Sequence, residues 1–173
     1  MSSFERLRDR LSDAERVVIL GIGNELRGDD IVGPLFARKF KRFEGERVLV
    51  LDCGLAPENF ANKIASFNPT HLIVVDAVDM SAPPGTIGVF DENSLPSASF
   101  STHKPSLLHL LAYLRSLQVN PELILLGIQP HDLSLLAPVS KDVKYSLESL
   151  LKVLRKALHP ILKGGYEKGG RAY

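Results

Sequence analysis

Short apolar runs alternate along the chain with longer segments in which apolar residues recur at helical spacing. Four runs, at residues 16–23, 47–53, 71–78 and 122–128, are continuous rather than alternating, which is typical of strands covered by helices on both faces. The alternation of strands and helices indicates βαβ units around a mainly parallel sheet. We therefore expect an α/β fold of three layers, α/β/α, built on a five-stranded, mostly parallel sheet.

The fifth and weakest strand is expected at residues 85–90, "GTIGVF". Little more than the turn at Pro83–Gly85 separates it from the end of the run at 71–78. No crossover helix fits into so short a connection, so this strand should be antiparallel or lie at an edge. The sheet should therefore be mixed.

Helices are expected between the strands, at residues 3–11, 30–43, 57–67, 104–117 and 141–158. The last has Ser140 as a candidate N-cap, followed by apolar residues that form one face at helical spacing. A single domain is expected over residues 1–158. Residues 159–173 are rich in glycine and basic residues, so we expect a flexible basic C-terminal tail.

Composition excludes several classes of protein. Of 173 residues, 45% are apolar and 24% are charged, as in ordinary globular domains, and the net charge of +1 gives no reason to expect nucleic acid as a partner. No apolar run is long enough for membrane insertion, and the charged N-terminus does not resemble a signal peptide. The single cysteine, Cys53, cannot form an internal disulfide. We expect a cytoplasmic protein that is a monomer when free.

Polar residues gather where the predicted strands end. In an open α/β sheet the loops at the carboxyl ends of the strands converge, and ligands bind there. Those loops, together with the segment before residue 104, should bring the following side chains to one edge of the sheet: Asn24, Asp29, Asp30, Asp52, Cys53, Asp76, Asp79, His103, Gln129, His131 and Asp132.

A dinucleotide-binding loop is one alternative for the first of these loops. Gly21 and Gly23 resemble the start of GxGxxG, but Leu26 occupies the position of the third glycine. Asp29 and Asp30 follow where a pyrophosphate would need a positive helix end, and their charges would repel it. The nucleotide interpretation is therefore disfavoured.

Two other interpretations of the aspartates stay open. Asp29 and Asp30 are at a helix start, where a carboxylate often caps the first turn. Asp76 ends a buried strand, where a carboxylate requires a hydrogen-bonding partner or a cation. Two carboxylates and the imidazole of His103 would form a ligand set suited to nickel or zinc. No GxSxG motif is present, and Cys53 would need a nearby histidine to become a thiolate nucleophile, so covalent catalysis is disfavoured.

Five ordered segments resemble a known family. "GIGNELRGDDIVGP", "LDCGLAPEN", "VVDAVDMSAPPG", "STHKP" and "LGIQPHDL" are similar to blocks of the [NiFe]-hydrogenase maturation endopeptidases, most of all to the hydrogenase-3 or formate-hydrogenlyase type. The resemblance spans about residues 16–158. It implies an aspartic-type or metal-dependent endopeptidase that removes the C-terminal extension of a hydrogenase large-subunit precursor after nickel insertion. Nickel contributed by the substrate would be the recognition element.

The resemblance also implies roles for individual residues. The family's metal ligands fall on Asp30, Asp76 and His103, with zinc or cadmium able to replace nickel in vitro. Asp30 and Asp76, assisted by Asp29, are the expected catalytic groups, and either a metal-bound water or a carboxylate pair sharing a proton would serve; we favour the metal route. Substrate contacts are expected from the rest of the edge: Asn24, Asp52, Cys53, Asp79 and Gln129.

Three further expectations complete this interpretation. Because three ligands leave coordination incomplete, the free protein should bind nickel, zinc or cadmium only weakly. Residues 91–102 are polar and rich in serine, so they should form a mobile loop that substrate orders. The competing function is a non-catalytic nickel-binding or nickel-delivery module for hydrogenase assembly, which would use the same ligands and release no peptide.

Overall fold

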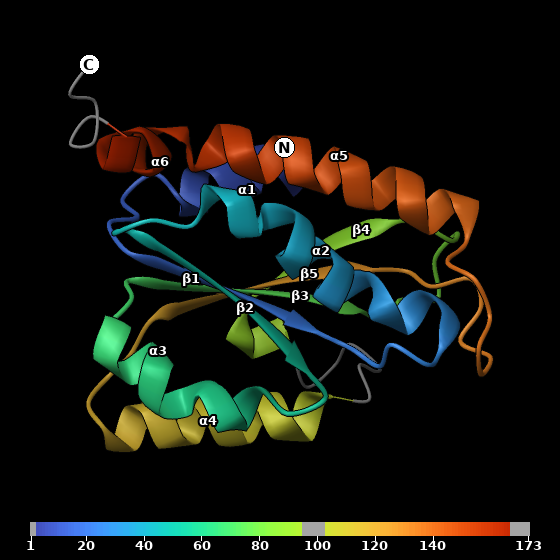
Figure 1. Cartoon of the computed structure of the whole chain (residues 1–173), viewed down its shortest axis with the longest axis horizontal. Helices are drawn as coiled ribbons and strands as arrows, with labels where there is room; N and C mark the ends of the chain where they lie inside the picture. The colour runs from blue at the N-terminus through green and yellow to red at the C-terminus, as the bar shows by residue number, and fades with distance from the viewer. Residues whose placement is uncertain (1–2, 95–102, 167–173) are drawn as a thin grey trace, which may run out of the picture.

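The chain forms a five-stranded mixed sheet, as expected (Figure 1). The computed structural model describes residues 3–94 and 103–166. Strands β1, β2, β3 and β5 are parallel, and β4 pairs antiparallel with β5 at the edge of the order β2-β1-β3-β5-β4. The strands span Val17–Ile22 (β1), Val48–Gly54 (β2), His71–Ala77 (β3), Ile87–Phe90 (β4) and Glu122–Ile128 (β5). The α/β class and the antiparallel edge strand are therefore confirmed.

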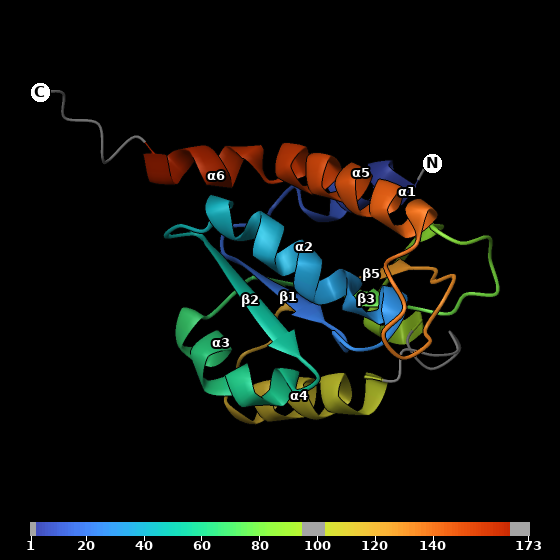
Figure 2. The same cartoon turned by 45° about the vertical axis from the view of Figure 1, so that its right-hand side comes forward.

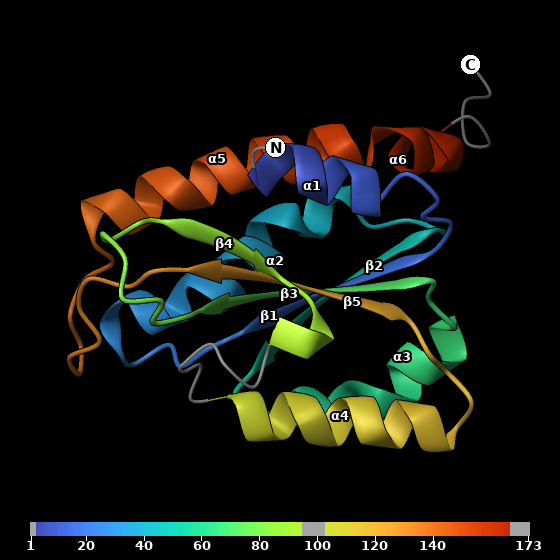
Figure 3. The same ribbon diagram turned by 180° about the vertical axis from the view of Figure 1, so that it is seen from behind.

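Helices cover both faces of the sheet (Figures 1 and 3). One layer contains α1 (Ser3–Arg10), α2 (Val32–Phe40), α5 (Lys141–Ala157) and α6 (His159–Tyr166). The other contains α3 (Ala61–Phe67) and α4 (Lys104–Ser116). Each layer has its own apolar core, because alternate residues of every central strand face opposite helices. The continuous apolar runs of β1 and β3 are buried throughout for this reason.

Two helix starts differ from the sequence expectation. Helices expected from residues 30 and 57 begin instead as 3-10 turns, η1 (Gly28–Ile31) and η3 (Pro57–Phe60). A third 3-10 turn, η2 (Lys41–Phe43), follows α2. Such turns are frequent at helix ends, where first-turn groups find partners outside the helix. In η1 the backbone N–H of Asp29 donates to the carbonyl oxygen of Asp132, 2.9 Å away.

The C-terminal boundary also differs from the expectation. The tail expected to begin at residue 159 instead starts with helix α6. Its residue Ile161 is buried and, with Leu158, joins the core beneath α1 and α5. Two apolar side chains at helical spacing are enough to dock this turn despite the basic, glycine-rich composition. Residues 167–173 lie outside the described part of the chain, as do residues 95–102 of the loop expected to be mobile; Glu92–Ser94 form a short 3-10 turn, η4.

Two glycines bring α2 close to the sheet. A Cβ atom on Gly33 would lie 2.1 Å from the carbonyl oxygen of Ile22 and 2.4 Å from that of Val75. A Cβ atom on Gly21 would lie 2.1 Å from the carbonyl oxygen of Gly33. Only hydrogen fits at both positions, so α2 crosses directly over β1 and β3. This close approach places η1, at the start of α2, beside the carboxyl ends of both strands.

Membrane insertion was not expected. Within residues 3–94 and 103–166, no helix combines the length and hydropathy that crossing a bilayer requires.

Candidate metal and catalytic site

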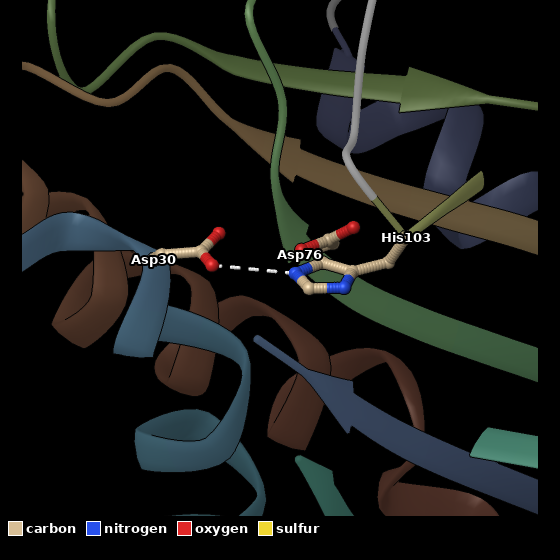
Figure 4. Close-up of side chains that lie close together, drawn as sticks. All are labelled: Asp30, Asp76 and His103. Carbon is tan, nitrogen blue, oxygen red and sulfur yellow. Dashed lines mark hydrogen bonds and ion pairs between the residues drawn. The ribbon is translucent and has the colours of Figure 1, made fainter. Parts of the chain in front are cut away.

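Asp30, Asp76 and His103 come together at the carboxyl edge of the sheet (Figure 4). Asp30 belongs to η1, Asp76 is near the end of β3, and His103 immediately precedes α4. Each offers one potential ligand atom, and these three atoms lie within 4.8 Å of one another. All three residues are buried. The structure thus brings together the three residues that the sequence analysis predicted as metal ligands.

The three groups interact electrostatically. The Nε2 atom of His103 lies 3.3 Å from Oδ2 of Asp30, and that oxygen also accepts the backbone N–H of Asn24 at 3.0 Å. Burial disfavours the charged imidazole, but the hydrogen bond to Asp30 and the charges of Asp76 and Asp30 outweigh it and raise the pKa of His103 above its ordinary value. The cluster therefore favours positive charge at its centre.

This donor set fits a divalent transition metal. Two carboxylate oxygens and one imidazole nitrogen are ligands that both nickel and zinc accept. The ligand atoms come from three separate elements, so their spacing depends on the packing of α2 and α4 on opposite faces of the sheet. A metal with three protein ligands keeps coordination positions for a substrate or for water.

Asp29 is completely buried and hydrogen-bonds to the loop between β5 and α5. Its Oδ2 atom accepts the backbone N–H groups of His131 and Asp132 at 2.8 and 2.9 Å. The backbone N–H and the hydroxyl of Ser140 donate to Asp29 at 2.7 and 2.8 Å. Asp29 is thus a positioning residue that fixes the loop between β5 and α5. These contacts take the place of the capping role considered from the sequence, and a direct catalytic role for Asp29 stays a prediction.

Ser140 was expected to cap α5 and does not. It occupies the N-cap position, but its side chain makes no capping hydrogen bond to the helix. Its hydroxyl instead donates to Asp29. No local sequence signal distinguishes these two roles, because the partner lies 111 residues away in the chain.

Gln129 and Asp79 shape the loop after β3. The Oε1 atom of Gln129 accepts the backbone N–H of Met80 at 2.6 Å, and its amide nitrogen donates to Asp79 at 3.2 Å. Asp79 is exposed, and the backbone N–H of Ser81 together with Gln129 lowers its pKa. Both residues hold the loop that follows Asp76; a substrate contact by either stays a prediction.

The other expected substrate-binding residues have different surroundings: Asn24 contacts the cluster, and Asp52 and Cys53 do not. Asn24 accepts the backbone N–H of Leu26, and its own N–H donates to Asp30. Asp52 pairs with Arg38 at 2.8 Å. Cys53 is buried in the core beneath α3 and α4, where burial and the charge of Asp52 raise its pKa to about 12. A thiol so rarely ionised is unsuited to act as nucleophile or thiolate ligand. The geometry does not bring Asp52 or Cys53 into the three-residue cluster.

Comparison with known proteins identifies a consistent set of relatives. The family profile described as HycI, hydrogenase maturation protease, matches residues 32–157. The hydrogenase 3 maturation protease of Escherichia coli K12 is 35% identical over 138 residues, which cover 79% of this chain and 87% of that protein.

Solved structures agree with the sequence comparison. The crystal structure of a [NiFe] hydrogenase maturation protease HycI from Thermococcus kodakarensis is 31% identical, covers 89% of this chain and 99% of its own, and superposes with a TM-score of 0.78. The hydrogenase maturating endopeptidase HybD from Escherichia coli is 27% identical and covers 84% of this chain and 93% of its own, with a TM-score of 0.73. The sheet and its flanking helices are thus shared with proteins of known architecture.

Proposed function

Because the chain belongs to the HycI family of hydrogenase maturation proteases, we propose that it is an endopeptidase that removes the C-terminal extension of a [NiFe]-hydrogenase large-subunit precursor. The observation that carries this proposal is the buried cluster of Asp30, Asp76 and His103, whose potential ligand atoms lie within 4.8 Å of one another. Peptidase activity agrees with the names of the relatives, and the cluster supplies a place where a peptide bond can be activated.

The precursor's own nickel is the recognition element in this proposal. Asp30, Asp76 and His103 supply two oxygens and one nitrogen, so substrate ligands are needed to complete the coordination of an inserted ion. A precursor without nickel offers these three residues nothing to bind. The cluster would therefore distinguish a loaded precursor from an empty one before any bond is cut.

Hydrolysis then needs a polarised carbonyl and a deprotonated water. A divalent ion held by Asp30, Asp76 and His103 would polarise the carbonyl and lower the pKa of a bound water. Each of Asp30 and Asp76 has two carboxylate oxygens, so one can bind the ion while the other accepts the proton of the attacking water and returns it to the nitrogen of the leaving peptide. Asp29 keeps η1 fixed against the loop after β5, which holds Asp30 in place. The buried, protonated thiol of Cys53 takes no part.

Mass spectrometry of a large-subunit precursor tests this function. The nickel-loaded precursor and a nickel-free preparation of the same precursor are each incubated with the protein. We expect loss of the C-terminal peptide from the loaded precursor alone, because only that form presents an ion to the cluster. Binding of the loaded precursor without peptide release would contradict the proposal and favour the non-catalytic nickel module. Equal cleavage of both forms would contradict recognition through nickel.

A further inference from the structure

The loop between β5 and α5 exposes three leucines near the candidate site. Leu133, Leu135 and Leu136 are 42%, 67% and 75% exposed, and Leu26, in the loop after β1, is 57% exposed. The backbone N–H of Leu136 donates to the carbonyl oxygen of Leu26 at 2.7 Å, so the two loops are joined. We call these four residues the leucine surface.

The backbone beneath the leucine surface is firmly anchored. Asp29 accepts hydrogen bonds from residues at both ends of the loop, His131 and Asp132 at one end and Ser140 at the other. At Gly28, where φ is +50°, an added Cβ would lie 2.2 Å from the carbonyl oxygen of Asp132. The two loops therefore pack without space between them. The exposed leucines are therefore carried by a well-anchored backbone. Such preorganisation of the loop lowers the entropic cost of binding.

The backbone conformation of Leu136 destabilises the folded chain. Its φ of +58° lies in the left-handed region, which leucine adopts less readily than glycine or asparagine. Its side chain is 75% exposed, so apolar burial does not offset that cost. Neither backbone conformation nor core packing accounts for a leucine at this position. Exposed apolar side chains gathered on two joined loops are typical of a binding surface.

The leucine surface is connected directly to the candidate site. Asp29, which anchors its loop, immediately precedes Asp30 of the cluster. Figure 2 shows the loop at residues 130–140 beside the loop that leads from β1 into η1, at the edge of the sheet where Asp76 lies. A peptide whose scissile bond reaches Asp30 and Asp76 must have further residues along this edge. Apolar side chains in that peptide would find apolar partners there.

We propose that the leucine surface binds an apolar segment of the large-subunit precursor that adjoins the cleaved bond. This inference rests on the proposed function and adds to it a substrate-binding surface and the chemistry of the segment bound. The nickel cluster fixes one point of the substrate, and the leucine surface provides a second contact that fixes the direction of the chain. Two such contacts also restrict cleavage to a nickel-loaded protein with an apolar segment at the correct distance.

Steady-state cleavage of the nickel-loaded precursor tests this surface with matched variants. Leu136→Asn removes the apolar side chain and suits the left-handed backbone, and Leu135→Ser removes a second contact. The control is Leu117→Ser, at a leucine that is 43% exposed at the end of α4 far from His103. We expect KM to rise about tenfold or more in the Leu135 and Leu136 variants, with a smaller change in kcat, since removal of a buried leucine contact costs roughly that much.

Thermal melting separates binding from folding. Leu136→Asn should melt at or above the wild-type temperature while KM rises, because asparagine adopts the left-handed conformation at this position more readily than leucine. The proposal is overturned if KM stays within twofold of wild type in both variants, or if Leu117→Ser raises KM equally.

A binding measurement keeps this inference distinct from the proposed function. Calorimetry with the nickel-loaded precursor should show weaker binding by the Leu135 and Leu136 variants than by the wild-type protein. If that difference is found and the wild-type protein cleaves nothing, only the proposed protease activity is rejected. Equal binding by wild type and both variants would reject the leucine surface. Sedimentation that finds a wild-type dimer converted to monomer by these substitutions would assign the surface to a second copy of the chain and also overturn the proposal.

Discussion

Asp29 and Asp30 are neighbours in the chain but have different partners. Asp30 faces His103 and Asp76, and Asp29 accepts hydrogen bonds from the loop after β5. Because parallel strands end at one edge, the order of the elements predicted that Asp30 and Asp76 lie at the same edge. The resemblance to the maturation endopeptidases was needed to select these two and His103 from the other polar residues expected there. The partners of Asp29 lie more than 100 residues away, so no local pattern separated its positioning role from capping or catalysis.

Asn at position 29 should weaken the fold. Asp29→Asn replaces one acceptor oxygen with an amide group that faces backbone donors, so we expect a loss of about 1–3 kcal/mol in the free energy of unfolding. Chemical denaturation measures this loss. Ser140→Ala, which deletes one hydroxyl donor and leaves the backbone N–H of residue 140 in place, should cost less. An unchanged denaturation midpoint for Asp29→Asn would contradict the role assigned to this carboxylate.

At the scale of elements, α2 positions the site by its close approach to the sheet. Gly33→Ala would place a Cβ within 2.4 Å of two backbone carbonyl oxygens, on β1 and β3. Because these carbonyl groups belong to two paired strands, they cannot move aside easily. We therefore expect α2 to shift and the free energy of unfolding to fall by about 2 kcal/mol or more. Gly45→Ala is the matched control, because a Cβ there meets nothing within 4 Å. Equal denaturation midpoints for the two variants would show that α2 does not pack as described.

The elements differ in how far sequence could predict them. The strands of the sheet were predicted closely because burial on both faces demands continuous apolar residues, which leave a clear signal. The antiparallel edge strand β4 followed from the shortness of its connection. Helix α6 was missed because its basic, glycine-containing composition is typical of a tail, and Leu158 and Ile161 are too few apolar residues to mark a helix by their spacing. Its docking depends on Ile161 meeting a core built by distant elements.

In the whole molecule, the residues that stabilise the fold and the residues of the candidate site occupy different regions. Two apolar cores hold the sheet between its helices, and the polar side chains of the site occupy the carboxyl edge. The end of α6 lies toward the opposite end of the molecule (Figure 1). Substitutions at the edge should therefore change activity without unfolding the sheet, provided that they leave Asp29 and its loop intact.

One measurement tests most directly the claim that Asp30, Asp76 and His103 form the site. It is the rate at which the Asp76→Asn and His103→Gln variants release the C-terminal peptide from the nickel-loaded precursor. Both variants should melt near the wild-type temperature, and cleavage should fall by about 100-fold or more, since loss of a group that only supports a metal ligand already costs up to that much. His109→Gln, the same change at an exposed position of α4, should cleave normally. Variants at Asp76 and His103 that melt normally and still cleave at near the wild-type rate would contradict the assignment of this cluster as the site.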